Sequence, residues 1–408
     1  MAKIIFLLTQ SLDSPSGLGR YFPLAEQLVN LEHEVTIFAL HPSYDELKKK
    51  SLQVNGVLVT YVSPMHVKKS GDFKSYYSGV KLIQITLRAT MQLTIAAIKH
   101  KADIFIIGKP HPMNSVAGLI ARIFHRSQVI LDCDDYEAGS GRFNSKWQKS
   151  IISAFEKWVP KQVNSVLTNT FFMRDNLISW GVNPDKIYYL PNGVDISRFQ
   201  PPEQQEVNSL RNELGLEEKK VIGFIGSLSL PSHPVNLLLE AFQELQNDDQ
   251  NFRLLLVGGG EDLPTLKNLA HKSDRPECIL FTGRVPPEKI SLYYYLLDVS
   301  VDPVYDDEAA KGRSPLKLFE SWACGVPIIT SDVGDRRNLL GQPEAGLLVK
   351  PGDPASLAQG IRSITMYPDF ANELSLRGKQ RVKSYTWDHL VMNINREFQS
   401  LIAKIPHD

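Results

Sequence analysis

The sequence predicts an α/β protein made of two doubly wound parallel sheets. The chain has 408 residues, which predicts two to three domains at roughly 150 residues each. It is 43% hydrophobic, which is enough for packed cores. Short runs rich in Val, Ile and Leu alternate with longer mixed segments, as in parallel sheets that helices cover on both faces. One interruption divides this alternation, so the two halves read as separate domains.

The apolar runs give the expected strands. In the first half these are 3–9, 34–40, 57–62, 103–107, 128–132, 163–168 and 186–190. In the second half they are 221–226, 252–257, 278–282, 298–302, 327–330 and 346–349. Helical periodicity marks four of the intervening segments, which are 234–247, 262–272, 314–323 and 354–366.

The interruption at 195–218 contains Gln200-Pro201-Pro202 and then a charged run, a composition typical of linkers. We therefore place the first domain at 1–195 and the second at 196–385. A last helix, at about 386–404, is expected to pack back on the first domain.

The segment from Ile83 to Ile95 alternates strictly between apolar and polar residues. Such alternation is typical of a half-buried strand. The segment is long for a strand, however, and no turn residue interrupts 80–100. We expect a helix here, with a strand as the alternative.

The 45 basic residues balance 45 acidic ones, so the formal net charge is zero. That balance argues against the basic composition of a nucleic-acid-binding protein and the acidic composition of a disordered chain. Divided at residue 200, however, the chain carries +7 before that point and −7 after it. The basic first half leaves an anionic acceptor or membrane surface open as a partner.

Three cysteines, Cys133, Cys278 and Cys324, lie far apart and form no disulfide or metal-binding pattern. We therefore expect a reducing, cytoplasmic setting and no metal. The apolar run at the start is too short for a signal peptide, and no stretch approaches the roughly 20 apolar residues of a spanning helix. The sequence predicts a soluble protein.

A glycine-containing turn follows the first expected strand, with the sequence Ser14-Pro15-Ser16-Gly17-Leu18-Gly19-Arg20. Glycines between a strand and a helix let backbone amides approach a phosphate at the helix N-terminus. A third glycine and an acidic residue after the second strand are missing, so NAD binding has little support. The alternative is a plain tight turn, and the same two explanations apply to Val257-Gly258-Gly259-Gly260-Glu261.

The segment 311–329 reads as a cationic loop, a helix and an apolar strand. Ser314 and Pro315 suit the N-cap and N1 positions of the helix. Loop amides, Lys317 and the helix dipole can converge on a pyrophosphate, and Glu320 can accept hydrogen bonds from sugar hydroxyls. The alternative is a surface helix with an ordinary i, i+3 pair between Lys317 and Glu320.

The same segment, with its Glu-x-x-Ala-Cys-Gly-Val-Pro core, resembles the donor-binding helix of the family 4 retaining glycosyltransferases. Further motifs of that family follow in order along nearly the whole chain, which makes the resemblance specific. They are Leu190-Pro191-Asn192-Gly193-Val194-Asp195, Phe224-Ile225-Gly226-Ser227, 237–242, 255–260, 281–285, 349–353 and Tyr385-Thr386-Trp387. The resemblance implies the GT-B fold, in which two Rossmann-like domains face each other across a cleft.

The resemblance also implies a transferase that uses a nucleotide sugar, with a UDP- or GDP-sugar as the expected donor and with no metal or other cofactor. The second domain would hold the donor, and the first would hold a glycan or lipid-linked acceptor. Glu320 would bind the ribose hydroxyls, and the backbone at Arg284 and Val285 would line the base pocket. The expected diphosphate contacts are the amides of Gly17, Gly19, Leu316 and Lys317.

The sequence departs from the family pattern at four positions. Gly312 replaces the first of two glutamates, and Ser227 and His233 replace an Arg and a Lys after the opening strand of the second domain. Asp134 stands at the position of an active-site His. His233 is then either a protonated substitute for the Lys or a solvated loop histidine. The remaining cations for a diphosphate are Lys317, Arg313, Lys311 and Arg20.

In the candidate site, the expected catalytic residues are Asp134, Lys317 and Glu320. The residues expected at the acceptor or sugar follow strands whose carboxyl ends face the cleft, and they are Lys109, His111 and Asp135. The acids that could orient the sugar in place of Gly312, unless they form only a solvated loop, are Asp306, Asp307 and Glu308. The expected donor-binding residues are Gly17, Gly19, Ser227, His233, Arg284, Val285, Arg313, Ser314, Pro315, Leu316, Lys317 and Glu320.

The predicted function is transfer of a sugar from a nucleotide-diphosphate donor with retention of configuration. Two alternatives stay open, which are a catalytically weak nucleotide-sugar-binding protein of GT-B type and a nucleotide-sugar epimerase. A weak peripheral membrane contact is a further hypothesis, with a solvated basic loop as its alternative. It rests on the cations of one segment, Lys68, Lys69, Lys74, Lys81 and Arg88.

Overall fold

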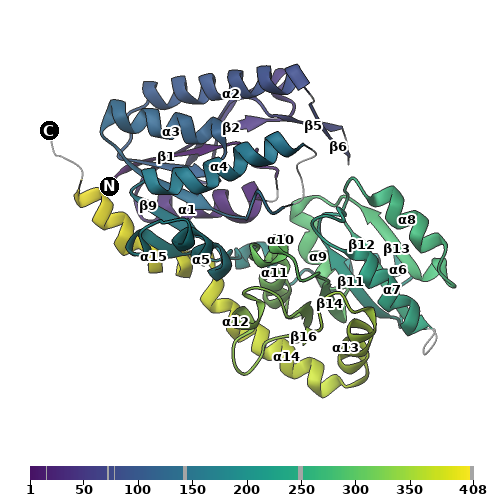
Figure 1. Cartoon of the computed structure of the whole chain (residues 1–408). Coiled ribbons are helices and arrows are strands. Elements are labelled where there is room, and N and C mark those ends of the chain that lie inside the picture. The colour runs from purple at the N-terminus through teal and green to yellow at the C-terminus, as the bar shows by residue number, and fades with distance from the viewer. Residues whose placement is uncertain (15, 71–72, 78, 141–144, 247–250, 405–408) are drawn as a thin grey trace.

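The computed structural model describes residues 1–14, 16–70, 73–77, 79–140, 145–246 and 251–404. It contains two mainly parallel sheets, each covered by helices on both faces (Figure 1). The predicted α/β class, with two doubly wound sheets, is therefore confirmed.

The first sheet has the strand order β10-β9-β8-β7-β1-β2-β4-β3. All neighbours run parallel except β3, which pairs antiparallel with β4. The chain fills the sheet in opposite directions from β1 and β7, and open α/β sheets bind ligands beyond the carboxyl ends of the strands at such a switch point. The strands are β1 (Lys3–Leu8), β2 (Glu34–His41), β3 (Ser51–Val54), β4 (Val57–Pro64), β7 (Ile104–Gly108), β8 (Gln128–Cys133), β9 (Ser165–Thr168) and β10 (Ile187–Tyr189).

The second sheet has the order β13-β12-β11-β14-β15-β16, and all of its neighbouring strands are parallel. Its switch point lies between β11 and β14. The strands are β11 (Lys220–Ile225), β12 (Phe252–Val257), β13 (Ile279–Gly283), β14 (Val299–Asp302), β15 (Ile328–Ser331) and β16 (Leu347–Val349).

Helices cover both faces of each sheet. In the first domain, α1 and α15 bury their apolar side chains on one face, and α2 to α5 bury theirs on the other. The first-domain helices are α1 (Phe22–Asn30), α2 (Gly79–Lys99), α3 (Pro112–His125), α4 (Lys146–Gln162) and α5 (Phe171–Ser179). The others are α6 (Gln204–Glu213), α7 (Val235–Gln246), α8 (Leu263–His271), α9 (Ile290–Tyr294), α10 (Glu308–Lys311), α11 (Leu316–Cys324), α12 (Arg336–Leu340), α13 (Pro354–Met366), α14 (Pro368–Arg381) and α15 (Trp387–Ala403).

The strictly alternating segment 83–95 lies inside the helix α2, as expected. Ile85, Ala89 and Leu93 face the sheet, four residues apart, and are buried. Leu87 and Met91 stand on the opposite side of the helix and are exposed. The alternation therefore reflects a helix with apolar residues on two faces rather than a strand.

Two antiparallel hairpins were not predicted. β3 and β4 are joined by Asn55 and Gly56, whose φ angles of 46° and 80° suit a type I′ turn. The Asn-Gly pair is a hairpin signal, but β3 was not predicted because it is almost wholly exposed and so is not an apolar run. β5 (Val67–Ser70) and β6 (Phe73–Tyr76) form a second, separate hairpin.

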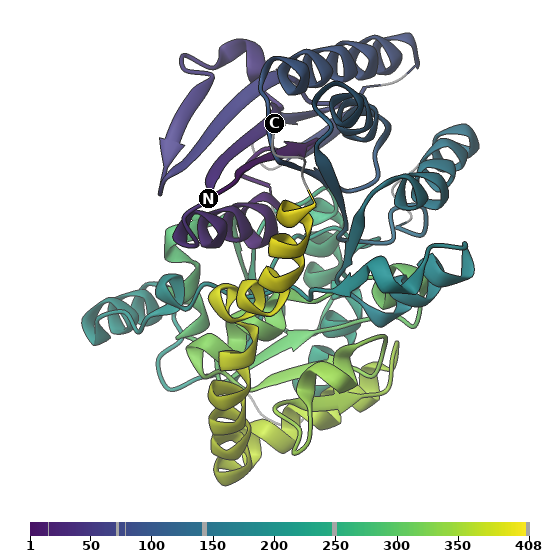
Figure 2. The ribbon, with the colours of Figure 1, turned by 90° about the vertical axis from the view of Figure 1, so that its left-hand side faces the viewer.

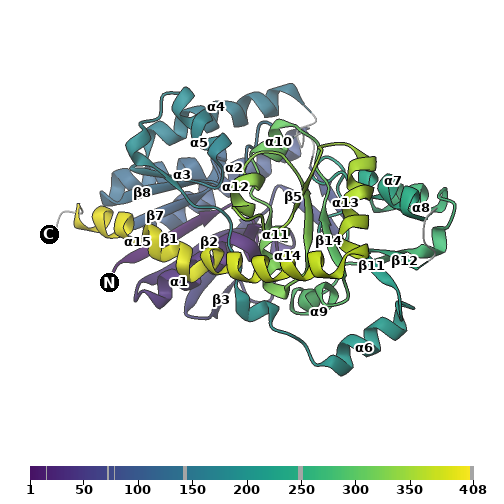
Figure 3. The ribbon, with the colours of Figure 1, turned by 90° about the horizontal axis from the view of Figure 1, so that it is seen from below.

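The chain crosses between the two sheets twice, and the crossings pair with each other. The Val194 N–H donates to the Tyr385 carbonyl over 2.9 Å, and the Trp387 N–H donates to the Val194 carbonyl over 3.3 Å. After the second crossing, α15 lies along α1, where Phe398 is fully buried in the first-domain core (Figure 2). Figure 3 shows α14 and α15 running in line from the second domain to the first.

Candidate active site

Loops at the carboxyl ends of the two sheets touch each other. The backbone N–H of Asn192 donates to Ser314 Oγ over 3.1 Å, and its side-chain amide donates to the Ser314 carbonyl over 2.9 Å. The Phe171 N–H, at the start of α5, donates to the Asp335 carboxylate over 2.9 Å. The two switch points therefore lie on the sides of the domains that meet.

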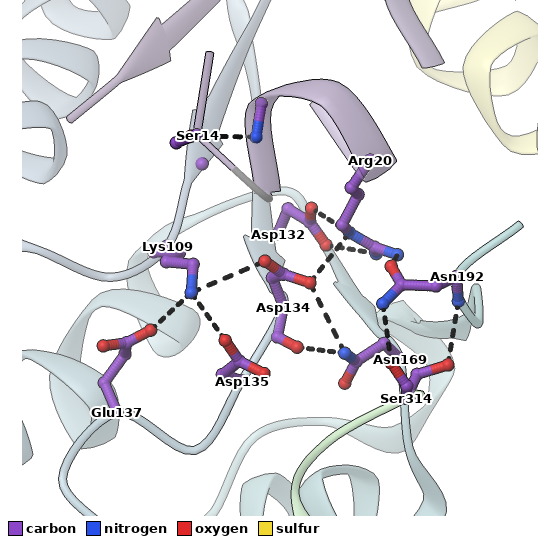
Figure 4. A network of polar contacts seen from close by, with 12 residues as sticks. Ser14, Arg20, Lys109, Asp132, Asp134, Asp135, Glu137, Asn169, Asn192 and Ser314 are labelled. Atoms are coloured by element: carbon purple, nitrogen blue, oxygen red, sulfur yellow. Dashed lines mark hydrogen bonds and ion pairs between the residues drawn. The ribbon is translucent and has the colours of Figure 1, made fainter. Parts of the chain in front are cut away.

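Arg20 is a buried arginine that joins several segments of the first domain (Figure 4). Its guanidinium donates twice to Asp132, at the end of β8, with both distances 2.6 Å. It also donates to the Leu190 carbonyl over 3.1 Å and to Asn192 Oδ1 over 3.0 Å. Burial alone would lower the pKa of Arg20, but Asp132 and Asp134 raise it above its ordinary value. The expectation that Arg20 meets a diphosphate is wrong, because Asp132 neutralises it and burial hides it.

The two glycines of the first turn have different neighbours. The Gly17 N–H donates to Ser14 Oγ over 3.0 Å, and an added Cβ at Gly17 would lie 2.3 Å from the Ser11 carbonyl oxygen. Gly17 is therefore required by the packing of its own turn. An added Cβ at Gly19 would lie 2.5 Å from the Leu316 side chain, so Gly19 lets α11 approach the first domain. The phosphate contacts expected for both glycines stay predictions.

Lys109 lies directly after β7, is buried, and has a left-handed φ of 68°. Its ammonium lies 2.6 Å from Glu137, 2.7 Å from Asp135 and 3.5 Å from Asp134 (Figure 4). Burial raises the pKa of Asp134 to about 6, although Lys109 and Arg20 act against that rise. One ammonium thus holds three carboxylates at the end of β8.

His111 extends this cluster towards β1. Its Nδ1 lies 3.2 Å from Thr9 Oγ1, and its Nε2 lies 3.5 Å from Glu137. Burial, together with His111, lowers the pKa of the neighbouring His66 to about 4. The structure thus brings the predicted Lys109, His111, Asp134 and Asp135 together. Glu137 was missed, although it stands three residues after Asp134 in the same loop.

Lys317 is buried at the second switch point. Its Nζ lies 3.6 Å from Asp302, 3.3 Å from His233 Nδ1 and 4.7 Å from the centre of the Phe224 ring. Burial lowers the pKa of Lys317, and Asp302 acts in the opposite direction. Asp302 also pairs with Arg336 over 3.1 Å. Neither Asp302 nor Arg336 was predicted, although Asp302 ends an expected strand.

His233 is half-buried in the loop between β11 and α7. Its ring meets the Phe224 ring edge-on, with the centroids 5.7 Å apart, and its backbone N–H donates to the Ser229 carbonyl over 2.8 Å. His233 is therefore partly packed within its loop, and its role as a substitute for the Lys stays a prediction. Arg313 donates to the Ser232 carbonyl in the same loop. Ser227 opens the loop and is partly exposed.

The helix α11 begins at Leu316, with Pro315 at the N-cap position and no side chain capping it. The prediction of Ser314 as N-cap and Pro315 as N1 is wrong by one residue. Ser314 Oγ instead accepts the Asn192 N–H across the domain contact. The N-terminal amides of α11 therefore lack a side-chain cap beside the Lys317 ammonium.

Gly312 packs against Tyr136 of the first domain. An added Cβ at Gly312 would lie 2.6 Å from Tyr136 Cβ and 3.2 Å from its backbone nitrogen. A glutamate in this position would collide with the Tyr136 Cβ and would crowd the Tyr136 backbone, which accounts for the glycine. Tyr136 was not predicted, because nothing in the sequence pairs it with Gly312.

The three acids before Gly312 are exposed, as the solvated-loop alternative expects, and two of them make local contacts. Asp307 caps the short helix α10 by accepting the Ala310 N–H over 2.7 Å. Asp306 pairs with Lys311 over 2.9 Å on the surface. Glu308 begins α10 and is exposed.

Glu320 lies one turn after Lys317 and accepts a hydrogen bond from the Tyr294 hydroxyl over 2.8 Å. Burial raises the pKa of Glu320, and the Tyr294 hydrogen bond, Arg198 and Lys317 act against that rise. Arg284 and Val285 follow β13, with Arg284 exposed. Val285 packs on the core cluster that contains Tyr294, and the expected base and ribose contacts stay predictions.

Across the described ranges, no group of three or more His, Cys, Asp or Glu side chains is arranged to hold a metal ion. Over the same ranges, no helix combines the length and apolar character needed to cross a membrane. Cys133, Cys278 and Cys324 are buried, free thiols.

Two family models match the chain. "Glycosyltransferase Family 4" matches residues 17–198, and "Glycosyl transferases group 1" matches residues 219–366. The architecture matches solved GT-B structures along nearly its whole length. One is sucrose-phosphate synthase of Thermosynechococcus elongatus, at a TM-score of 0.81, 18% identity, and 99% and 100% coverage of the two chains. Another is Anabaena HepE in complex with UDP and glucose, at a TM-score of 0.73, 16% identity, and 98% and 100% coverage of the two chains.

The chain has the GT-B fold and belongs to the family 4 glycosyltransferases. It is 26% identical over 223 residues to D-inositol 3-phosphate glycosyltransferase of Corynebacterium jeikeium, which is 53% of this chain and 52% of that protein. It is also 26% identical over 271 residues to alpha-monoglucosyldiacylglycerol synthase of Streptococcus pneumoniae, which is 62% and 58% of the two chains. The chain spans about half the length of the curated relatives it matches.

The Arg20–Asp132 pair gives a stability prediction. Arg20→Met leaves Asp132 buried without its partner, which is expected to lower the free energy of unfolding by about 3–5 kcal/mol. Arg20→Met/Asp132→Asn removes both charges and is expected to recover part of that loss. Urea unfolding of the full chain measures both variants.

The matched control is Arg174→Met, which breaks a surface Arg–Asp pair in the same domain and is expected to cost at most about 1 kcal/mol. A loss for Arg20→Met no greater than for Arg174→Met would contradict the structural role of Arg20.

Proposed function

We propose that this chain is a retaining glycosyltransferase that moves a sugar, without a metal ion, from a nucleotide-diphosphate sugar to a glycan or lipid-linked acceptor. The observation that carries the proposal is the position of Lys317 beside the N-terminus of α11 at the second switch point. A buried ammonium next to a helix N-terminus without a side-chain cap favours an anion. A diphosphate is the anion that a nucleotide sugar supplies.

The donor would lie along the start of α11. Its diphosphate would meet Lys317 and the first amides of the helix, and Glu320, one turn on, would accept hydrogen bonds from the ribose hydroxyls. The base would lie against the backbone at Arg284 and Val285. The Tyr294 hydroxyl, which donates to Glu320, supports this arrangement by fixing the carboxylate.

In the reaction, the bond from the sugar C1 to the phosphate oxygen breaks while the acceptor oxygen bonds to C1 on the same face. The proton of the acceptor hydroxyl passes to the departing diphosphate. Lys317 and the α11 dipole would stabilise the negative charge that develops on that leaving group. Asp134, Asp135 and Lys109 would hold hydroxyls of the sugar or acceptor from the first domain.

The proposal is tested by incubating the purified chain with UDP-, GDP- and ADP-sugars and measuring nucleotide release and sugar configuration by NMR. Slow hydrolysis in which the first-formed sugar keeps the donor's anomeric configuration supports a retaining transferase. Binding without turnover would favour the nucleotide-sugar-binding protein, and an isomerised sugar would favour the epimerase.

The Lys317 ammonium is expected to be needed for rapid release of the nucleotide. A charge-assisted contact contributes roughly 1.5–3 kcal/mol, so Lys317→Ala is expected to slow nucleotide release by about 10- to 150-fold. Arg336 still pairs with Asp302 in this variant, so the fold is expected to persist. The control is Lys350→Ala, which removes a surface lysine of the same domain. Unchanged turnover in folded Lys317→Ala would refute the assignment.

The membrane hypothesis takes a more specific form. We propose that α2, α3 and α4 lie against an anionic membrane surface. Half of the exposed large apolar side chains in the described chain belong to these three helices. They are Val80, Ile83, Leu87, Met91, Ile95, Ile123, Phe124, Trp147, Ile151 and Trp158.

The charges of these helices support an anionic partner. Along α2, α3 and α4 the single carboxylate, Glu156, is buried. Their exposed cations are Lys81, Arg88, Lys99, Lys146, Lys149, Lys157 and Lys161, with Arg88 3.9 Å from the exposed Asp45. Two copies meeting through this face would bring cations together, whereas anionic lipid would neutralise them. The side chains of Lys69 and Lys74 lie outside the described residues.

Vesicle flotation tests this surface. The chain is expected to float with phosphatidylcholine vesicles that contain phosphatidylglycerol, and less with phosphatidylcholine alone. Leu87→Ser/Met91→Ser is expected to lower the bound fraction by about tenfold or more, since each large apolar side chain contributes roughly 1.5 kcal/mol or more when buried.

Leu376→Ser is the matched control, because Leu376 is 63% exposed and Leu87 is 64% exposed, and Leu376 lies on α14 of the second domain. Equal flotation on both vesicle types, or an equal loss with Leu376→Ser, would contradict the membrane surface. Self-association that Leu87→Ser/Met91→Ser abolishes would assign the face to a second copy instead.

A further inference from the structure

The contact between His233 and Lys317 has a consequence for donor binding. Both groups carry or can carry a positive charge, and His233 Nδ1 lies 3.3 Å from Lys317 Nζ. At that distance two protonated groups repel each other, whereas a neutral imidazole accepts a hydrogen bond from the ammonium. The geometry therefore favours neutral His233 while the site holds no anion.

Two helix N-termini reinforce this preference. His233 stands two residues before α7, and Lys317 lies in the first turn of α11. The positive end of a helix dipole disfavours a protonated imidazole nearby. A dianionic diphosphate at the same place would reverse the preference, because it attracts both the ammonium and an imidazolium.

We propose that His233 takes up a proton when the donor diphosphate binds, and so supplies on demand the second cation of the site. This inference rests on the proposed function, since it needs a nucleotide sugar at Lys317. It predicts that donor affinity falls as pH rises, because the bound state carries one more proton than the free state.

Other charged groups surround His233, and each stays in place in the variants below. Arg313 donates to the carbonyl of Ser232, the residue before His233. Asp302 and Arg336 lie behind Lys317. The carboxylates of the facing loop hold the segment that leads to His233, with Glu261 accepting from Ser229 Oγ over 2.9 Å and Asp262 accepting from the Leu230 N–H over 2.7 Å.

Calorimetric titration of the full chain with UDP-glucose and GDP-mannose tests the proposal. Each titration is made near neutral pH in two buffers with different ionisation enthalpies, which gives the number of protons taken up. These donors carry a diphosphate that is fully ionised near neutral pH, so the ligand itself contributes little. The wild-type chain is expected to take up a measurable fraction of one proton, and its affinity is expected to fall as pH rises, by at most about tenfold per pH unit.

Two variants isolate His233. His233→Gln keeps a polar side chain but cannot be protonated, so it is expected to bind more weakly without this proton uptake. His233→Lys provides a permanent cation, so it is expected to bind with an affinity that no longer follows pH. The matched control is His271→Gln, an exposed histidine that ends α8, and it is expected to behave as the wild type.

Proton uptake that persists in His233→Gln, or wild-type binding without uptake, would overturn the inference and leave the proposed function standing. Failure of the wild-type chain to bind any nucleotide sugar would instead overturn the proposed function, and this inference with it.

Discussion

The buried Arg20–Asp132 pair is the interaction on which the arrangement of the site depends. It fixes the turn after β1 to the end of β8, and the same guanidinium holds the crossover at Leu190 and Asn192. Asn192 in turn bonds to Ser314, two residues before α11. The position of Lys317 against the first domain is therefore linked, through Asn192, to a fully buried ion pair of that domain.

The net charge differs between the whole chain, its two halves and the two switch points. The zero net charge of the chain combines a basic first half with an acidic second half. Locally the signs reverse, since the ends of β7 and β8 gather four carboxylates around Lys109 and Arg20, whereas the second switch point places two cations, Lys317 and Arg336, around Asp302. An acidic domain can thus hold an anion, because burial and helix termini set the local field.

The sequence was sufficient for the parallel strands, since buried parallel strands are apolar along their whole length, but it missed the antiparallel strands β3, β5 and β6. It was also sufficient for gathering Lys109, His111, Asp134 and Asp135 at strand ends. It could not reveal contacts between segments far apart in the chain. Gly312 packs against Tyr136 only where the two domains meet, so the sequence could not show why a glycine stands there. In the same way, Ser314 Oγ accepts the Asn192 N–H across the domain contact and does not cap α11. Arg20 looked like a free cation because its partner, Asp132, lies 112 residues away.

Hydrogen exchange with and without a nucleotide sugar reports where on the chain the donor binds. With the donor bound, we expect slower exchange of the backbone amides at 226–234 and 312–318, the two segments that meet at Lys317 and His233. Protection confined to other segments, with these amides unchanged when the site is saturated, would contradict the placement of the donor at the second switch point.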